Sequence, residues 1–291
     1  MKPGPFDYYA PVTTEEALEY LSSLGEGVKV LAGGQSLIPT MNFRMGRPTA
    51  LVDLNKVKEL DYIRKTKDGG VALGAMTRDS KVEDDPYVIE KYPVVIETLK
   101  HIGFRQIRNR GTFGGTLAHA DPAAQLPALA IALNTKMLVR SKKGERWVTA
   151  DDFFVGPFTT VCGTEDLLTE VVLPPLDKRS GWSYEQVSRE KTGYAQAGVV
   201  TIVKLNRKGQ CEDVRLVVFS VDEKPILSKY AAETLKGKSP SEELFNDVAA
   251  YVANNEVEPA SDVHATADYR RHVVEVLVKR SLSQAFERAK K

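Results

Sequence analysis

The periodicity of apolar residues changes near residue 57, and this change limits the chain to a small number of folds. Before it, apolar stretches of strand length such as "VKVL" alternate with helical stripes such as "TTEEALEYLSSLGEG". Thr13, with Glu16 three residues later, makes a capping-box start for that helix, and Gly25 is a good C-terminal stop. Strands that alternate with helices predict a small α/β unit over residues 1 to 57.

After residue 57 the strands come in pairs. "DYIRKTKDGGVALGAMT" and "KMLVRSKKGERWVTA" each place two strands around a glycine-containing turn, which is the signal of a β-hairpin. Between them "YPVVIETLKHIG" predicts a helix that ends at Gly103, and "DLLTEVVLP" predicts a closing strand. Residues 58 to 177 are therefore expected to form an antiparallel sheet with helices on one side.

A third region follows "PPLDKRSG" (174–181), a linker rich in proline, glycine and charge. Beyond it three strands are predicted, in "WSYEQVSRE", "AGVVTIVKL" and "CEDVRLVVFS", and three helices come after them. Strands followed by helices indicate an α+β domain over residues 178 to 291. The fold class of the whole chain is predicted to be α+β.

Charge and cysteine content exclude several classes of protein. The chain has 291 residues, a formal net charge of +1 and two cysteines. With so little net charge, no overall field favours nucleic acid or an anionic membrane. Cys162 and Cys211 are too few, and too far apart, to hold an iron–sulfur cluster or a structural zinc ion. The start has no signal-peptide pattern and no apolar run reaches membrane-spanning length, so we expect a cytoplasmic protein.

Two short glycine loops are the candidate binding elements. "LAGGQSL" (31–37) and "TFGGT" (112–116) each precede a predicted helix. Glycine lets the backbone approach a ligand closely, and consecutive amides in front of a helix can hold an anion. Two such loops would suit a diphosphate held from both sides. Neither loop matches GxGxxG or GxxxxGK[ST], so the signatures of a Rossmann site and of a P-loop are missing.

The chain resembles the FAD-binding subunit of molybdenum hydroxylases, a family that includes carbon monoxide dehydrogenase medium subunits and the flavin domain of xanthine dehydrogenase. Three stretches carry the resemblance: "AGGQSLIP" at 32–39, "IRNRGTFGGTLAHADPAA" at 107–124 and "REKTGYAQAG" at 189–198. The resemblance covers essentially the whole chain. It implies the fold of p-cresol methylhydroxylase-type flavoproteins, with a small α/β subdomain, a larger antiparallel one and an α+β tail domain.

The resemblance also implies which residues hold the diphosphate of FAD. Backbone amides of the two glycine loops are expected to bind it, and three hydroxyl side chains, Ser36, Thr112 and Thr116, could add donors. The residues carried over from the family for this contact are Ala32, Gly33, Gly34, Gln35 and Ser36 in the first loop, and Thr112, Phe113, Gly114, Gly115 and Thr116 in the second.

Five further positions are carried over to the rest of the cofactor. Ile102, Leu168 and Tyr194 are expected beside the isoalloxazine ring. Gln125 stands where the family usually has an acidic residue that serves the adenosine ribose, and its amide can still hydrogen-bond hydroxyl groups. Gln196 stands where xanthine dehydrogenases tend to have Lys, which bears on flavin potential and acceptor choice.

The function implied by the resemblance is electron transfer. No residues form an acid/base pair, an activated nucleophile or a metal site, so no catalytic residue is assigned. The chemistry would belong to non-covalently bound FAD. The family implies a large molybdenum-cofactor subunit and a small iron–sulfur subunit, in a dimer of heterotrimers, with electrons leaving through FAD to NAD, a quinone or oxygen. Two alternatives stay open: a self-contained FAD-dependent oxidoreductase and a non-redox nucleotide-binding module.

Two features near the second loop have more than one interpretation. His119 could contact the cofactor or be a hydrogen-bonded structural histidine. The cluster of Arg105, Arg108 and Arg110 could contact a partner subunit or a phosphate, or form a solvated basic face.

Overall fold

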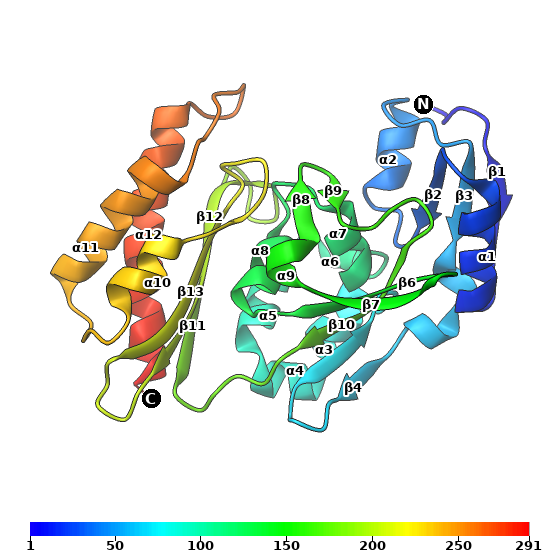
Figure 1. Cartoon of the computed structure of the whole chain (residues 1–291). Helices are drawn as coiled ribbons and strands as arrows, with labels where there is room; N and C mark the ends of the chain where they lie inside the picture. Colours follow the sequence, from blue (N-terminus) through cyan, green and yellow to red (C-terminus); the bar gives the residue numbers. More distant parts are fainter. Residues whose placement is uncertain (291) are drawn as a thin grey trace.

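The computed structural model describes residues 1–290, and its sheets follow one another along the molecule from the N-terminal to the C-terminal part (Figure 1). The first sheet has three strands in the order β1-β3-β2, with parallel pairing throughout. Its strands are β1 (Asp7–Tyr9), β2 (Val28–Leu31) and β3 (Ala50–Asp53), and its helices are α1 (Thr14–Leu24) and α2 (Leu37–Asn42). The strand–helix–strand pattern is confirmed. Strand β1 was not predicted, because a three-residue stretch of partly exposed residues carries no periodicity.

The start and end of α1 follow the predicted signals. Thr13 accepts a hydrogen bond from the amide of Glu16 at 3.1 Å, and the Glu16 carboxylate accepts one from the amide of Val12 at 2.8 Å. Gly25 ends the helix with φ of +68°, a value that favours glycine. Capping therefore places this helix from its own sequence alone.

The second sheet is antiparallel and has five strands in the order β4-β5-β10-β6-β7. Both predicted hairpins are confirmed, and the predicted closing strand lies between them in the sheet. The strands are β4 (Ile63–Lys65), β5 (Val71–Gly74), β6 (Lys136–Ser141), β7 (Gly144–Thr149) and β10 (Leu167–Leu173), with a small ribbon formed by β8 (Phe154–Gly156) and β9 (Thr159–Thr160).

Helices cover one face of this sheet, as predicted. Val171 of β10 pairs with Leu73 and Met137 on its two neighbours, and all three side chains join the helices in one hydrophobic cluster. The helix expected to reach Gly103 ends at Leu99, because the chain turns there and Gly103 takes φ of +50°. The helices of this region are α3 (Asp79–Asp84), α4 (Pro86–Lys91), α5 (Pro93–Leu99), α6 (Arg105–Arg108), α7 (Phe113–His119), α8 (Gln125–Ala132) and α9 (Ala150–Phe153), after the 3-10 turns η1 (Leu54–Lys56) and η2 (Lys58–Leu60).

The C-terminal region has the predicted order of strands and then helices. Its antiparallel sheet has four strands in the order β11-β12-β13-β14, one more than expected, since the two-residue β14 is too short to show a pattern. The elements are β11 (Ser180–Ser188), β12 (Ala195–Leu205), β13 (Cys211–Phe219), β14 (Ile226–Leu227), α10 (Lys229–Leu235), α11 (Glu242–Tyr251), η3 (Val252–Glu256) and α12 (Ala267–Ala289). Within residues 1–290 no helix has both the length and the apolar character to cross a membrane.

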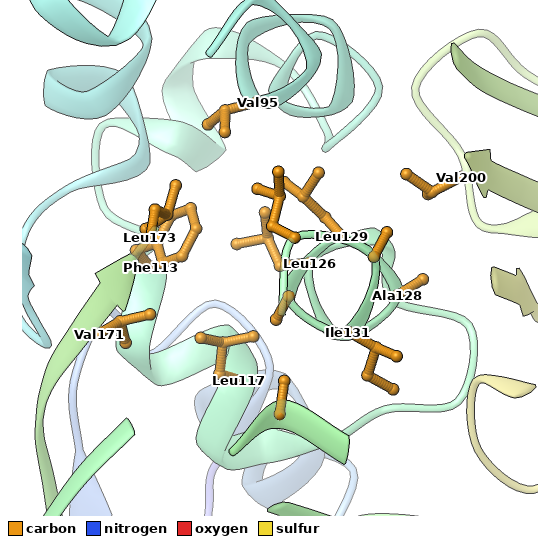
Figure 2. Close-up of a cluster of buried hydrophobic side chains, with 14 of the residues drawn as sticks. Val95, Phe113, Leu117, Leu126, Ala128, Leu129, Ile131, Val171, Leu173 and Val200 are labelled. Atoms are coloured by element: carbon orange, nitrogen blue, oxygen red, sulfur yellow. The ribbon is translucent and has the colours of Figure 1, made fainter. Parts of the chain in front are cut away.

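Helix α8 joins the second sheet to the C-terminal sheet. All eight of its residues are buried, as expected for a helix that packs on every side. Figure 2 shows Leu126 and Leu129 of α8 facing the region of Val171 and Leu173 on β10, while Val200 of β12 lies on the other side of the helix. These side chains belong to one continuous hydrophobic cluster. The two sheets therefore share a core, and α12 packs on the remaining face of the C-terminal sheet.

Candidate cofactor site at the two glycine loops

The two glycine loops, far apart in the sequence, lie against each other. A Cβ atom at Gly33 would collide with the carbonyl oxygen of Arg110 and lie 2.8 Å from the Cα of Gly111. A Cβ atom at Gly115 would lie 3.1 Å from the Cβ of Ala32. The first loop (residues 31–37) follows β2, and Arg110 and Gly111 directly precede the second loop (residues 112–116), where α7 begins. The expected meeting of the two loops is thus present.

The first loop presents a row of unused backbone donors. Among residues 1–290, the amides of Gly33, Gly34, Gln35 and Ser36 donate to no protein acceptor. Gly34 has φ of +73°, and the carbonyl of this residue accepts from Ile38 at 3.2 Å at the start of α2. Successive free amides around a residue with positive φ form a concavity that binds anions. The first loop therefore fits the phosphate groups of a nucleotide cofactor.

The second loop differs from expectation, because the amides of Phe113 to Thr116 already have protein acceptors. The amide of Phe113 donates to the carbonyl of Thr77 at 2.9 Å, and that of Gly114 to the carbonyl of Ala75 at 3.1 Å. The amide of Gly115 donates to Oγ1 of Thr112 at 3.1 Å. The end of β5 and the cap residue thus satisfy the start of α7. The expected row of free amides is absent from the second loop.

The glycines of the second loop are required by packing. A Cβ atom at Gly114 would collide with Ala75, and one at Gly115 would collide with the hydroxyl of Thr112. The expectation that these glycines serve only a close approach of the ligand is therefore incomplete, since their bare backbone first lets α7 lie against β5. The hydroxyl of Thr116 donates to the Thr112 carbonyl at 3.4 Å, a weak bond that leaves its oxygen able to accept.

A turn over His101, Ile102 and Gly103 is held by two buried side chains. Arg108 donates from Nη1 to the carbonyls of Ile102 (3.1 Å) and Gly103 (2.8 Å). Gln125 donates from Nε2 to the carbonyl of His101 at 3.4 Å. All three successive carbonyls therefore have side-chain donors, and the backbone that carries Ile102 has a defined position. Gln125 is 6% exposed, and its Oε1 has no partner within the described chain.

The arginine cluster divides into paired and unpaired members. Glu83 of α3 accepts from Nε of Arg108 at 2.9 Å and from Nη2 at 3.1 Å, in a two-pronged, largely buried ion pair. Arg105 pairs with Glu83 at 2.8 Å and with Asp84. Arg108 is accordingly a structural residue, which neither sequence interpretation foresaw. The side chain of Arg110 is exposed and has no partner in residues 1–290.

The expected ring contacts lie in different surroundings. Leu168 is buried in β10, next to a register shift of the strand pairing. Tyr194 is 64% exposed, and desolvation of its hydroxyl, followed by the nearby Asp121 carboxylate, raises the pKa of its phenol. Gln196 instead donates from Nε2 to the carbonyl of His264 at 3.1 Å, which ties it to the loop before α12.

His119 has the packing of a structural residue. Its ring lies 5.2 Å from the ring of Phe158, and burial lowers the pKa of the imidazole. The neighbouring Ala120 has φ of +51° and its carbonyl accepts from Phe158 at 2.9 Å. These contacts fix the C-terminal end of α7 beside the β8–β9 ribbon.

Asn55 and Arg78, which the sequence interpretation missed, lie between the two loops. Asn55 donates from Nδ2 to the carbonyl of Ala32 at 3.0 Å and accepts at Oδ1 from Nη2 of Arg78 at 2.5 Å. Arg78 also donates from Nη1 to the carbonyl of Arg110. Asn55 lies in η1, shortly after β3, and Arg78 is the residue before α3, in the segment that follows β5. That position is the only sequence signal for them.

Comparisons with known proteins agree with this architecture. Residues 4–176 match the family described as the FAD-binding domain in molybdopterin dehydrogenase, and residues 182–285 match the carbon monoxide dehydrogenase flavoprotein C-terminal domain. The chain is 38% identical to the 6-hydroxypseudooxynicotine dehydrogenase complex subunit alpha of Paenarthrobacter nicotinovorans, with 100% of this chain and 97% of that protein covered. It is 36% identical to the glyceraldehyde dehydrogenase medium chain of Sulfolobus acidocaldarius, covering 98% and 99%.

A solved structure supports the same assignment. The carbon monoxide dehydrogenase from Hydrogenophaga pseudoflava, in a form that lacks the Mo-pyranopterin moiety of the molybdenum cofactor, contains a chain that superposes with a TM-score of 0.95. The two chains are 34% identical, and 99% of each is covered. Fold, loop geometry and sequence therefore agree that this chain belongs to the family of FAD-binding domains of molybdopterin dehydrogenases, with a C-terminal domain of the carbon monoxide dehydrogenase flavoprotein type.

Proposed function

We propose that this chain passes electrons, through bound FAD, from the iron–sulfur clusters of a partner subunit to an external acceptor such as NAD, a quinone or oxygen. As a member of its family it is an oxidoreductase subunit. The observation that carries the proposal is the row of unused amides at Gly33–Ser36, which lies against a second glycine loop. In this family such a pair of loops is suited to a dinucleotide diphosphate.

FAD would be held without a covalent bond, mainly by the first loop. The amides of Gly33, Gly34, Gln35 and Ser36 would bind the diphosphate, with Ala32 at the start of the same loop and the second-loop residues Thr112 to Thr116 forming the opposite wall. Because the amides of Phe113 to Thr116 have protein acceptors, that wall would contribute shape and the hydroxyl of Thr116 more than backbone donors.

The ring and the ribose would lie further along the same face. Ile102, on the clamped turn, and Leu168 are proposed to contact the ring, and Tyr194 to cover it, since its exposed side chain is free to pack on a ligand. Oε1 of Gln125 would accept from a ribose hydroxyl. Gln196 would influence the flavin without direct contact, since its side-chain amide donates to the carbonyl of His264.

The division of labour follows from the residues present. When bound, FAD supplies the redox chemistry, and the chain supplies binding, orientation and shielding of the ring. The chain has two cysteines, both free, whereas an iron–sulfur cluster takes about four thiolates. The clusters are therefore assigned to a small partner subunit and the molybdenum cofactor to a large one.

The proposed assembly is a dimer of heterotrimers in the cytoplasm. Relatives are named as a complex subunit and as medium chains, which supports a heteromeric complex here. Free cysteines suit a reducing compartment. Within the chain we propose functional units at 1–57, 58–177 and 178–291, with the cofactor between the first two.

The proposal is tested by anaerobic titration of the purified chain at the flavin absorbance band. We expect about one FAD per chain, reduction by dithionite, and no bleaching by aldehydes, purines or carbon monoxide until the partner subunits are added. Bleaching by such a substrate without partners would favour a self-contained oxidoreductase. A chain that binds nucleotide but never carries flavin would favour the non-redox module.

A further inference from the structure

Among the described residues, one polar connection joins the two glycine loops. It runs from the carbonyl of Ala32 through Asn55 and Arg78 to the carbonyl of Arg110. The first loop follows a strand of the first sheet and the second loop lies outside the named strands, so no strand pairing within residues 1–290 sets their separation. Gly33 permits the backbones to touch, but a van der Waals contact alone does not prevent them from sliding.

Asn55 and Arg78, the two residues of this connection, are each held by further hydrogen bonds near the loop that they contact. The backbone amide of Asn55 donates to Oδ1 of Asp53 at 2.9 Å, at the end of β3. Asp53 also accepts from the hydroxyl of Tyr8 at 2.5 Å, which adds the neighbouring strand β1. On the other side, Arg78 forms a β-bridge with Thr112, and the amide of Asp79 donates to the carbonyl of Gly111 at 3.1 Å. The two N–H groups of the Arg78 guanidinium thus link the segment around Asn55 to the segment around Arg110.

We propose that Arg78 and Asn55 are positioning residues that set the spacing of the two loops and thereby the affinity for the diphosphate of the cofactor. This inference rests on the proposed function. The guanidinium is planar and offers two separate N–H groups, one for each partner, a geometry that lysine cannot reproduce. Both partners of Arg78 are protein oxygens, so its role is geometric and does not require contact with phosphate.

The test measures binding of FAD and of ADP to the full-length, flavin-free chain by isothermal titration calorimetry. Arg78→Lys keeps the charge but loses the fork, and it should weaken both ligands by the same factor, about ten-fold or more, as expected for one charge-assisted hydrogen bond. Asn55→Ala should have a similar effect. The double variant should be no weaker than the single ones, because both changes interrupt the same connection.

Arg110→Ala is the matched control. It removes an equal charge beside the same loop but leaves the carbonyl that Arg78 uses. Its effect should stay below about three-fold, because an exposed charge is screened by solvent. An Arg110→Ala loss as large as that of Arg78→Lys would show that charge, and not loop spacing, is responsible, and the inference would be wrong.

The remaining outcomes separate this inference from the proposed function. If Arg78→Lys and Asn55→Ala bind FAD as the parent does, the inference is overturned while the proposed function stands. A loss for FAD without a loss for ADP also overturns it, since the effect would then lie at the ring. A parent chain that binds neither ligand contradicts the proposed function, and the inference falls with it. Circular dichroism checks folding, and if one variant does not fold, the other decides.

Discussion

The side chain of Asp79, beneath the second loop, makes the stability of the folded protein depend on pH. It is 2% exposed, and its Oδ1 has no hydrogen-bond partner within the described chain. Burial raises the pKa of Asp79 to about 7, with Glu83 acting in the same direction and Arg108 and Arg78 opposing it. The usual Asp value is 3.8, so the folded protein retains a proton that the unfolded chain releases.

The sign of the pH dependence follows from this difference. Between about pH 4 and pH 7 the folded state binds more protons than the unfolded state, so this group lowers stability as the pH rises. Asp79→Asn removes the ionisation and should raise stability at pH 8 by on the order of 3 kcal/mol, with little effect at pH 4. Melting temperatures of both proteins from pH 4 to 8 measure this.

The control is Asp61→Asn, which changes a partly exposed carboxylate that pairs with Lys81 near the same helix. It should alter stability by less than about 1 kcal/mol at any of these pH values. Equal melting temperatures of Asp79→Asn and parent at pH 8 would contradict a raised pKa of the buried Asp79.

At the scale of elements, short helices are held by tertiary contacts more than by their own sequences. Helix α7 has seven residues and starts against the carbonyls of Ala75 and Thr77, and α8 has eight residues, all buried. Helices of this length do not form alone in water. Their stability therefore comes from the elements around them, and α8 lies in the one hydrophobic cluster that joins the second and C-terminal sheets (Figure 2).

The variant Leu129→Ala tests how far the stability of the protein depends on the packing around α8. Truncation of a fully buried leucine leaves a cavity and is expected to lower the free energy of unfolding by about 2–5 kcal/mol. The two tryptophans report on different sheets, since Trp147 lies in β7 and Trp182 in β11. In single-tryptophan versions of the variant, urea transitions followed by either fluorophore should shift by the same amount.

Leu244→Ala on α11 is the comparison, because Leu244 is only partly buried. It should cost less than Leu129→Ala. If the Trp147 transition shifted and the Trp182 transition did not, the two sheets would unfold independently, and the shared core would not couple them.

At the scale of the whole molecule, residues 1–290 form three larger sheets and the small β8–β9 ribbon, with three hydrophobic clusters, one of which spans the second and C-terminal sheets. The N-terminal cluster is separate, and from residues 58–177 its buried members are Leu60 of η2, Met76 after β5 and Leu167 at the start of β10. The N-terminal unit is thus the more loosely attached part, and the proposed cofactor lies where it meets the rest.

Cofactor binding should therefore be visible as unequal protection of the two loops from hydrogen exchange. Addition of FAD should slow exchange strongly at Gly33–Ser36, whose amides have no protein acceptor. The amides of Phe113 to Gly115 should change less, because they are already bonded in the free chain. Mass-spectrometric exchange with and without FAD measures both segments. The β6–β7 turn at 142–144 is an internal reference, and protection confined to the second loop would contradict the loop assignment.

The sequence by itself determined the features that depend on neighbours along the chain. The α1 capping residues, both hairpins of the second sheet and the strand-then-helix order after residue 180 were predicted and are confirmed. The glycine loops and the family resemblance were also recognised from short stretches, and the family is confirmed. Capping, turn and periodicity signals span only a few residues, so they can be read without the fold.

The tertiary structure decided what depends on residues brought together from distant positions. Strand β10 lies between the hairpins, and β1 joins the first sheet. Position 114 needs a glycine because a Cβ atom there would collide with Ala75. The tie from Asn55 to Arg78, and the use of Arg108 and Gln125 to hold one turn, have no local pattern. A hydrogen bond between side chains of separate elements depends on how the sheets and helices pack, and a single sequence does not display that packing.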